Sequence, residues 1–426
     1  MTREEVENGT DDMLIDGSDE QQRQDVNAVR HEVNANYLKS YYGKLFPVAD
    51  IHKWLSYGND GKHPRCDESY FGRREFSFTL ENDVYLRFRS YNSPSELEKY
   101  INDSLPFQID IGAVYSVDPS KRFAYAQSGD NVFIPVEREL VFDMDISDYD
   151  DVRYCCSGAD VCLECWPLMT ISIKVIDTSL RDFVLIVSIT DDFGFNHILW
   201  VYSGCHGVHC WVCDAKARRL SNEQRGAIAD YFHVYKGSEN SNKKVYLPGP
   251  ALHPFLTTSY TNVLKPFFEE KLICSQNLFS TEERYEKILE MIPDESIASE
   301  LRGKWQDKKR PPNSKEDFHI HRWEQLKNSL QSGKHLATGL RRCIEEIVFA
   351  YTYPRLDMEV SKHMNHLLKA PFCRVCVPID PNRCEEFDPT TVPTLSRLLE
   401  ELNSGASQMQ IDSENKLKHD AKSKLG

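Results

Sequence analysis

The stretch from Glu139 to Trp166 constrains this chain most, because it holds two metal-binding patterns of opposite chemistry. The first is the pair Asp143 and Asp145, whose hard carboxylate oxygens suit Mg²⁺ or Mn²⁺. The second is a run of four cysteines, whose soft thiolates suit zinc. A chain that carries an acidic pair beside a zinc site is expected to handle phosphates.

The acidic pair is predicted to lie on a strand. Apolar residues alternate with Asp143 and Asp145 over residues 140–147, and this period of two indicates a strand with one buried face. Both carboxylates then lie on one side, roughly 6–7 Å apart, close enough to share two metal ions about 3.5–4 Å apart. Because Asp148, Asp150 and Asp151 follow at once, a solvated acidic strand end is the alternative. A metal site needs a third ligand and phosphate-binding groups.

The cysteine run indicates a structural zinc site. The chain has 13 cysteines and shows neither a secretory signal nor an apolar run of about 18 residues, so we expect a soluble protein in a reducing compartment. Clustered cysteines there bind metal more often than they form disulfides, although buried free thiols are the alternative. Four ligands fill the coordination sphere of zinc, which would therefore be structural. The four are Cys155, Cys156, Cys162 and Cys165.

Residues 197–214 predict a β-hairpin, with strands over 198–202 and 208–213. Ser203 and the turn glycines would let backbone N–H groups approach a phosphate, and His209 is expected across from Ser203. A histidine with only a core or surface role is the alternative for His209. Cys205, His206, His209, Cys210 and Cys213 also suggest a second zinc site. We do not favour it, because Cys210 and Cys213 point to opposite faces of a strand and would not chelate one ion.

Taken together, the motifs resemble the small catalytic subunit of eukaryotic DNA primase, of the archaeo-eukaryotic primase superfamily. The resemblance covers most of residues 38–400 and keeps the family's order of motifs. The segments that carry it are YYGKLFP (41–47), RREFSFTL (73–80), IDIGAVYS (109–116), ELVFDMDISDYDDVR (139–153), CCSGADVCLECW (155–166), DFGFNHILWVYSG (192–204), GVHCWVCD (207–214), YPRLDMEVSKHMNHLLKAPF (353–372) and VPIDP (377–381).

The resemblance implies a role for each matching residue. Two catalytic Mg²⁺ or Mn²⁺ ions would be held by Asp143, Asp145 and Asp357. The incoming nucleotide would be bound by Ser203, His209, Lys369, Arg87 and Asp110. One zinc ion would be held by Cys155, Cys156, Cys162 and Cys165. Implied partners are the primase large subunit with its iron–sulfur domain, the DNA polymerase alpha complex (the primosome), single-stranded DNA template and ribonucleoside triphosphates, all in the nucleus.

Three departures from the family pattern stand out. Cys205 and His206 occupy positions where the family has two arginines before GVH. The loop after Phe372 is short and lacks the family's triphosphate-binding histidine. Residues 183–190 (FVLIVSIT) interrupt a familiar junction, either as an extra strand or as an aggregation-prone insert. These features suit a splice variant or faulty gene model as well as an altered enzyme.

The predicted fold class is α+β, a mixed-sheet primase catalytic core with a zinc-binding motif and an inserted helical subdomain. We expect helices over 167–182, 221–232 and 392–402. A basic stretch at 308–315 suits either nuclear import or a solvated loop. The chain is predicted to divide into a disordered acidic segment (1–32), a catalytic core with the zinc motif (33–232), a helical subdomain (233–352), a return to the catalytic core (353–402) and a disordered polar tail (403–426).

The predicted function is template-directed synthesis of short RNA primers by two-metal nucleotidyl transfer. The formal net charge of −15 implies weak intrinsic affinity for DNA and favours a partner that supplies it. One alternative is a catalytically weakened isoform that acts as an assembly or binding subunit, which the lost arginines suggest. A metal-dependent nuclease is another, but it leaves the triphosphate-binding residues unexplained.

Overall fold

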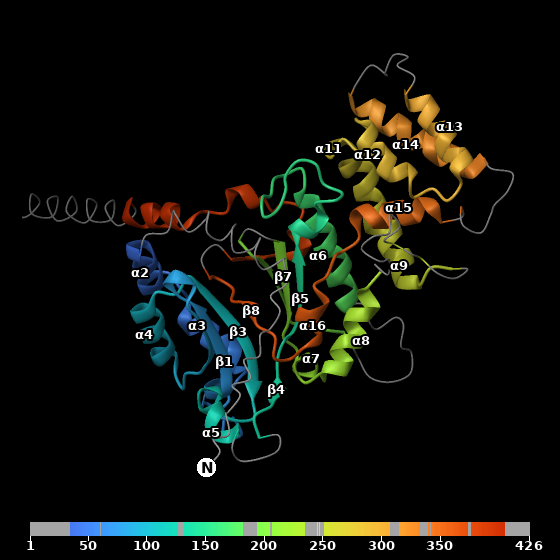
Figure 1. Ribbon diagram of the computed structural model, residues 1–426. Coiled ribbons are helices and arrows are strands. Elements are labelled where there is room, and N and C mark those ends of the chain that lie inside the picture. Colours follow the sequence, from blue (N-terminus) through green and yellow to red (C-terminus); the bar gives the residue numbers. More distant parts are fainter. Residues whose placement is uncertain are drawn as a thin grey trace, which may run out of the picture. The chain divides into compact units, whose positions relative to one another are not determined.

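Figure 1 shows the computed structural model of the chain, which describes residues 35–59, 61–126, 132–181, 194–204, 207–234, 245, 247, 251–306, 315–332, 340, 342–373 and 376–404. The chain divides into two compact units. The larger unit runs from residue 45 to 394 and contains both sheets. The smaller contains α2 (Ala35–Lys44) and a helix over 395–404, two residues past its predicted end. Segments 1–32 and 405–426 lie outside the described residues.

The first sheet comes mainly from the N-terminal part of the larger unit. Its strands are β1 (Arg74–Thr79), β2 (Tyr85–Arg89), β3 (Gln108–Tyr115) and β4 (Pro135–Glu137), in the order β2-β1-β3-β4, with β8 (Leu368–Lys369) also paired to β3. Helix α4 (Pro94–Ser104) begins at the Ser93 cap and packs the Tyr100 ring 4.9 Å from that of Phe78. Helix α3 (Val48–Ser56) packs beside α4, and α5 (Arg122–Ala126) follows β3.

The second sheet carries the acidic strand. It is formed by β5 (Leu140–Asp145), β7 (Gly207–Val212), β6 (Ile198–Tyr202) and β9 (Val377–Ile379), in the order β5-β7-β6-β9. Helix α6 (Trp166–Arg181) packs on this sheet, where Trp200 Nε1 donates to Asp177 Oδ1 at 2.9 Å. After α7 (Ala215–Arg218), α8 (Asn222–Phe232) begins at a capping box on Ser221, so this helix and its start are confirmed.

Every strand pairing among the described residues is antiparallel, so the expected mixed sheet is wrong for this part of the chain. The physical reason is the connectivity. Hairpins join β1 to β2 and β6 to β7, and a hairpin pairs its strands in opposite directions. The short strands β8 and β9 pair with β3 and β6, and they run opposite to these strands. The α+β class itself is confirmed.

Helices and short turns make up the described part of residues 251–352. The elements are α9 (Pro254–Ser259), α10 (Lys265–Phe267) and α11 (Ile273–Ser275), separated by π-helical turns, then α12 (Glu282–Leu289), α13 (Glu295–Gln306), α14 (Lys315–Ser332) and α15 (Cys343–Thr352). Trp305 anchors this part, with its ring 5.4 Å from those of Phe279 and Tyr285. The subdomain boundaries at 232/233 and 352/353 stay predictions. Within the described residues, no helix is long and apolar enough for a membrane span.

A buried ion pair joins the two sheets. Arg74 at the start of β1 donates from Nη1 to Glu139 Oε2 at 2.8 Å and from Nη2 to Oε1 at 3.0 Å. Both side chains are 0 % exposed, and Tyr57 donates a third bond to Glu139 at 2.6 Å. Because Glu139 directly precedes β5, this pair fixes the acidic strand against the first sheet.

Candidate active site and candidate metal centre

Asp143 and Asp145 lie on the half-buried face of β5, as the alternating pattern predicts. Strand β5 is an edge of its sheet, and its free edge is covered by a distant segment of the chain. Asp357 N donates to Asp143 O at 3.0 Å. This bond brings the third predicted carboxylate next to the pair although more than two hundred residues separate them in sequence.

Asp357 is held by its own helix. It is the N-cap of α16 (Met358–Lys362), where its Oδ1 accepts from Glu359 N at 2.9 Å and from Val360 N at 3.2 Å. Neither bond involves Oδ2, which leaves that oxygen available to a ligand. The helix cap therefore orients the carboxylate group through one of its two oxygens, Oδ1.

The three carboxylates repel one another electrostatically. Burial, followed by the charges of Asp145 and Asp357, raises the pKa of Asp143 well above its ordinary value. Burial, followed by Asp148 and Asp357, also raises the pKa of Asp145. Such a cluster is stable in its ionised form when cations sit among the oxygens. The donor set fits hard divalent ions such as Mg²⁺ or Mn²⁺.

His209 lies on β7 directly opposite Asp143. Its Nε2 is 3.4 Å from Asp143 Oδ1, and the side chain is buried. Its partner on the other side is Val201, so the expectation that it faces Ser203 is wrong. The hairpin closes between Ser203 and residue 207, two residues before His209, which places His209 deeper in the sheet.

Gly207 has a packing role that the sequence did not indicate. A Cβ at this position would lie 1.9 Å from Met144 O, so only glycine lets β7 approach β5 so closely. Gly207 N donates to Ser203 Oγ at 2.9 Å, which fixes the Ser203 side chain at the hairpin mouth. Cys205 and His206, between these residues, lie outside the described residues.

Lys369 connects the two sheets at the site. It belongs to β8, where it pairs with Asp110 of β3 in the first sheet. Its Nζ donates to Ser203 O, in the second sheet, at 2.9 Å. The charge of Lys369 acts against the burial that raises the pKa of Asp145 and of Asp110, so the ammonium group lies near both carboxylates.

Asp110 and Arg87 lie on the first sheet. Burial raises the pKa of Asp110 to about 6, although a hydrogen bond of 2.7 Å from Gln108 works against the rise. Arg87 Nε donates to Glu75 Oε1 at 3.0 Å, and its Nη2 donates to Asn365 O at 3.2 Å. Arg87 is therefore oriented by a fully buried acid before any ligand arrives.

Sequence reasoning missed two acids at this site. Glu75 holds Arg87, but a glutamate within a strand of aromatic residues gave no signal of that role. Asp148 adds charge to the carboxylate cluster. Burial raises the pKa of Asp148, the charge of Arg355 opposes this rise, and repulsion from Asp357 adds to it. Its position three residues after Asp145 was the available signal, but the sequence analysis used Asp148 only as support for the alternative of a solvated strand end.

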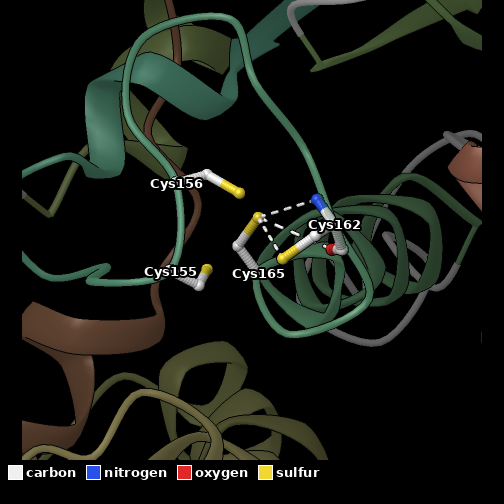
Figure 2. A group of neighbouring side chains, drawn as sticks. All are labelled: Cys155, Cys156, Cys162 and Cys165. Carbon is white, nitrogen blue, oxygen red and sulfur yellow. Dashed lines mark hydrogen bonds between the residues drawn. The ribbon is translucent and has the colours of Figure 1, made fainter.

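The four predicted zinc ligands come together in one place. Figure 2 shows the side chains of Cys155, Cys156, Cys162 and Cys165 directed toward a common centre. Their sulfur atoms all lie within 4.8 Å of one another. Cys162 N donates to Cys165 Sγ at 3.3 Å, the kind of backbone bond that stabilises a thiolate. Four sulfur donors at this separation fit a tetrahedral zinc ion.

Cys210 and Cys213 do not join a metal-binding group among the described residues. Cys210 is fully buried, whereas Cys213 Sγ accepts from Trp54 Nε1 at 3.4 Å. Residues 183–190 and the basic stretch to 314 lie outside the described stretches of the chain. The short loop after Phe372 closes with a bond of 2.8 Å from Phe372 N to Cys376 O.

Comparisons with known proteins show which family the chain is similar to. A family model described as DNA primase small subunit matches residues 142–381. The DNA primase small subunit of Drosophila melanogaster is 39% identical, covering 90% of this chain and 85% of its own length. That of Schizosaccharomyces pombe is 39% identical over 88% of this chain and 79% of its own length. The DNA primase small subunit of Saccharomyces cerevisiae is 36% identical, over 86% of this chain and 85% of its own length.

Proposed function

The chain belongs to the DNA primase small-subunit family, and on that premise we propose which of its residues perform primer synthesis. Its activity is that of a primase, a nucleotidyltransferase that makes RNA primers. The alternative, a catalytically weakened isoform that acts mainly as an assembly or binding subunit, is not favoured by these comparisons. The single observation that carries the residue assignment is the convergence of Asp143, Asp145 and Asp357 from two distant segments.

The three carboxylates are proposed to hold two Mg²⁺ or Mn²⁺ ions. When bound, such ions acidify an attacking hydroxyl and stabilise charge on phosphate oxygens. Asp143 and Asp145 contribute oxygens from a rigid strand, and the capped Asp357 contributes its Oδ2 from the other side. His209, 3.4 Å from Asp143, is proposed to contact the triphosphate from the floor of the site.

The remaining predicted residues are proposed to bind and orient the nucleotide. Lys369 and Ser203 meet at the junction of the two sheets, where an ammonium group and a serine hydroxyl suit a triphosphate. Arg87, which Glu75 orients, and Asp110, which pairs with Lys369, lie on the first sheet and are proposed to contact the same nucleotide. Catalysis here depends on positioning and electrostatics, without a covalent enzyme intermediate.

The test is primer synthesis from ATP on a poly-dT template, with the chain co-expressed with a primase large subunit. We expect metal-dependent synthesis of short RNA. Degradation of the template in the absence of nucleotides would instead support a metal-dependent nuclease. A folded complex without synthesis in either metal would contradict the catalytic assignment.

Lys369→Met is expected to raise the KM for ATP about 10- to 100-fold, with a smaller change in kcat. The substitution keeps the length of the side chain but removes a charge-assisted hydrogen bond to the triphosphate, which contributes about 1.5–3 kcal/mol. Steady-state kinetics of the co-expressed complex measure both constants. Lys99→Met, at an exposed helix position, is the control. An unchanged KM would exclude Lys369 from the triphosphate site.

We also propose one structural zinc ion per chain, held by the four clustered cysteines. Elemental analysis of the purified chain is expected to give one zinc, and Cys162→Ser is expected to lower zinc content and solubility together. Cys66→Ser is the matched control, because Cys66 lies outside the cluster. Full zinc occupancy in Cys162→Ser would remove this residue from the ligand set.

Membership of the family also suggests partners and location. A small subunit implies a complex with a large subunit, and a primase acts on a DNA template and nucleoside triphosphates. Association with the DNA polymerase alpha complex and location in the nucleus are proposed from the eukaryotic resemblance. Co-purification of tagged chain with both partners from nuclear extract tests them.

A further inference from the structure

One side chain from the helical region of the chain enters the four-cysteine loop. Gln276 directly follows α11 and is only 2 % exposed. Its Oε1 accepts from Tyr154 N at 2.7 Å, and its Nε2 donates to Glu164 O at 2.7 Å. Tyr154 directly precedes Cys155, the first cysteine of the loop, and Glu164 directly precedes Cys165, the last. A single amide group therefore holds both ends together.

The same amide also contacts a proposed zinc ligand. Gln276 Nε2 lies 3.4 Å from Cys155 Sγ, within the range of an N–H···S hydrogen bond. Such bonds stabilise negative charge on a ligating thiolate and fix its direction. Arg153 Nη1 also lies 3.8 Å from another proposed ligand atom, Cys165 Sγ. The cluster thus receives donors from the loop side and from the helical side.

A second contact ties the loop to α12. The Arg284 guanidinium lies 4.2 Å from the centre of the Tyr154 ring, and Lys287 Nζ lies 5.2 Å from it. Ser275 Oγ also donates to Glu164 O at 3.4 Å. Residues 275–287 therefore hold the loop through both hydrogen bonds and cation–π contacts.

Solvent reaches the cluster at Cys155. A cavity of about 660 Å³ is lined by Cys155, Tyr154, Gln276 and Asn277, among others. Cys155 is exposed, whereas Cys165 is buried. A competing ligand that enters this cavity meets Cys155 first, and Gln276 is the side chain that holds Cys155 in place there.

We propose that Gln276 is a positioning residue that retains the zinc ion, and that the metal in turn fastens residues 273–289 to the cysteine loop. Loss of zinc then begins at Cys155 and frees this helical segment from the loop. This inference rests on the proposed zinc site. It goes beyond that site because it assigns retention of the metal to Gln276. This residue is not a zinc ligand and lies more than a hundred positions after the cysteines in sequence.

The test measures the release of zinc from the full chain to a chelating dye. Groups that hydrogen-bond to metal ligands typically change metal affinity 10- to 100-fold, so Gln276→Ala is expected to release zinc about 10- to 100-fold faster than the unaltered chain. Gln276→Glu is isosteric and keeps the acceptor for Tyr154 N, but it replaces the donor to Cys155 with a carboxylate. It is expected to release zinc at least as fast as Gln276→Ala.

Asn277→Gly is the matched control. Asn277 lines the same cavity without touching the cluster in the described contacts, and its φ of 50° is one that glycine adopts without strain. Its release rate is expected to stay unchanged. Hydrogen exchange in residues 273–289 gives a second readout, which is expected to rise on chelation in the unaltered chain and without chelation in Gln276→Glu.

The possible failures are distinguishable. An unaltered chain that contains no zinc would overturn the zinc proposal itself. Zinc in the unaltered chain with equal release rates in Gln276→Ala, Gln276→Glu and Asn277→Gly would overturn only the role of Gln276. Should Gln276→Ala fail to fold, the isosteric Gln276→Glu decides the question alone.

Discussion

Asp143→Asn and Asp145→Asn are each expected to lower primer synthesis by about a thousandfold or more, without loss of the folded state. Removing one carboxylate from a metal site costs several kcal/mol of transition-state stabilisation, and every 1.36 kcal/mol is a factor of ten in rate. The fold is retained because asparagine has the same shape and removes a charge that its neighbours repel. Without metal, the melting temperature is therefore expected to stay level or rise.

The measurement is nucleotide incorporation on poly-dT by variants co-expressed with a large subunit, together with melting curves with and without Mg²⁺. Asp103→Asn serves as the control, since Asp103 is an exposed helix residue. Addition of Mg²⁺ or Mn²⁺ is expected to raise the melting temperature of the unaltered chain but to have a much smaller effect on either variant. Near-normal incorporation by Asp143→Asn would contradict the assignment.

Arg74→Met is expected to destabilise the larger unit by about 3–5 kcal/mol. Breaking a buried ion pair at one partner leaves the other charge without compensation in a dry environment. Here the remaining charge would be Glu139, which is 0 % exposed and accepts two bonds from Arg74. Chemical denaturation of the full chain near pH 7 measures the loss.

A double variant shows whether the loss comes from the stranded charge. Arg74→Met combined with Glu139→Gln is expected to recover much of the stability, because neither side chain is then ionised. Exposed Lys99→Met is the control. A double variant less stable than the sum of the single changes would show that shape, and not charge, dominates at this position.

The Arg74–Glu139 ion pair also predicts that the stability of the protein depends on pH. Burial alone would raise the pKa of Glu139, but attraction and hydrogen bonds from Arg74 lower it to about 2. A lowered pKa contributes stability above the unfolded value of about 4.3, and this contribution is lost as the pH falls toward 2. The difference between the unaltered chain and Arg74→Met is therefore expected to be largest near neutral pH and to shrink below about pH 4.

Local patterns in the sequence predicted most of the longer elements. Alternation found β5, the Ser221 cap found the start of α8, and the glycine-rich turn found the β6–β7 hairpin. Each of these signals is contained within a dozen neighbouring residues. The predicted partner of His209 was wrong because the length of the turn, and not its composition, sets the register between β6 and β7.

The periodicity of apolar residues could not predict contacts between residues that lie far apart in the sequence. Strands β8 and β9 have two and three residues, too few for any period to be read. Asp357 and Lys369 entered the predicted site through resemblance alone, and their roles stay predictions. Glu75 and Arg74 are buried polar residues whose partners, Arg87 and Glu139, lie far from them in sequence, so their sequence neighbours gave no sign of pairing.

The late position of β8 and β9 has a consequence during synthesis of the protein. The segment that carries both strands joins the first sheet at Lys369 and the second sheet at Val377, and it leaves the ribosome more than two hundred residues after Asp143 and Asp145. Until then, the nascent chain displays Asp143 and Asp145 without Asp357 or Lys369. Under the proposed assignment, a ribosome-bound or truncated chain that ends before residue 357 is expected to consume no nucleotides. The site is completed only after β8 and β9 have joined the two sheets.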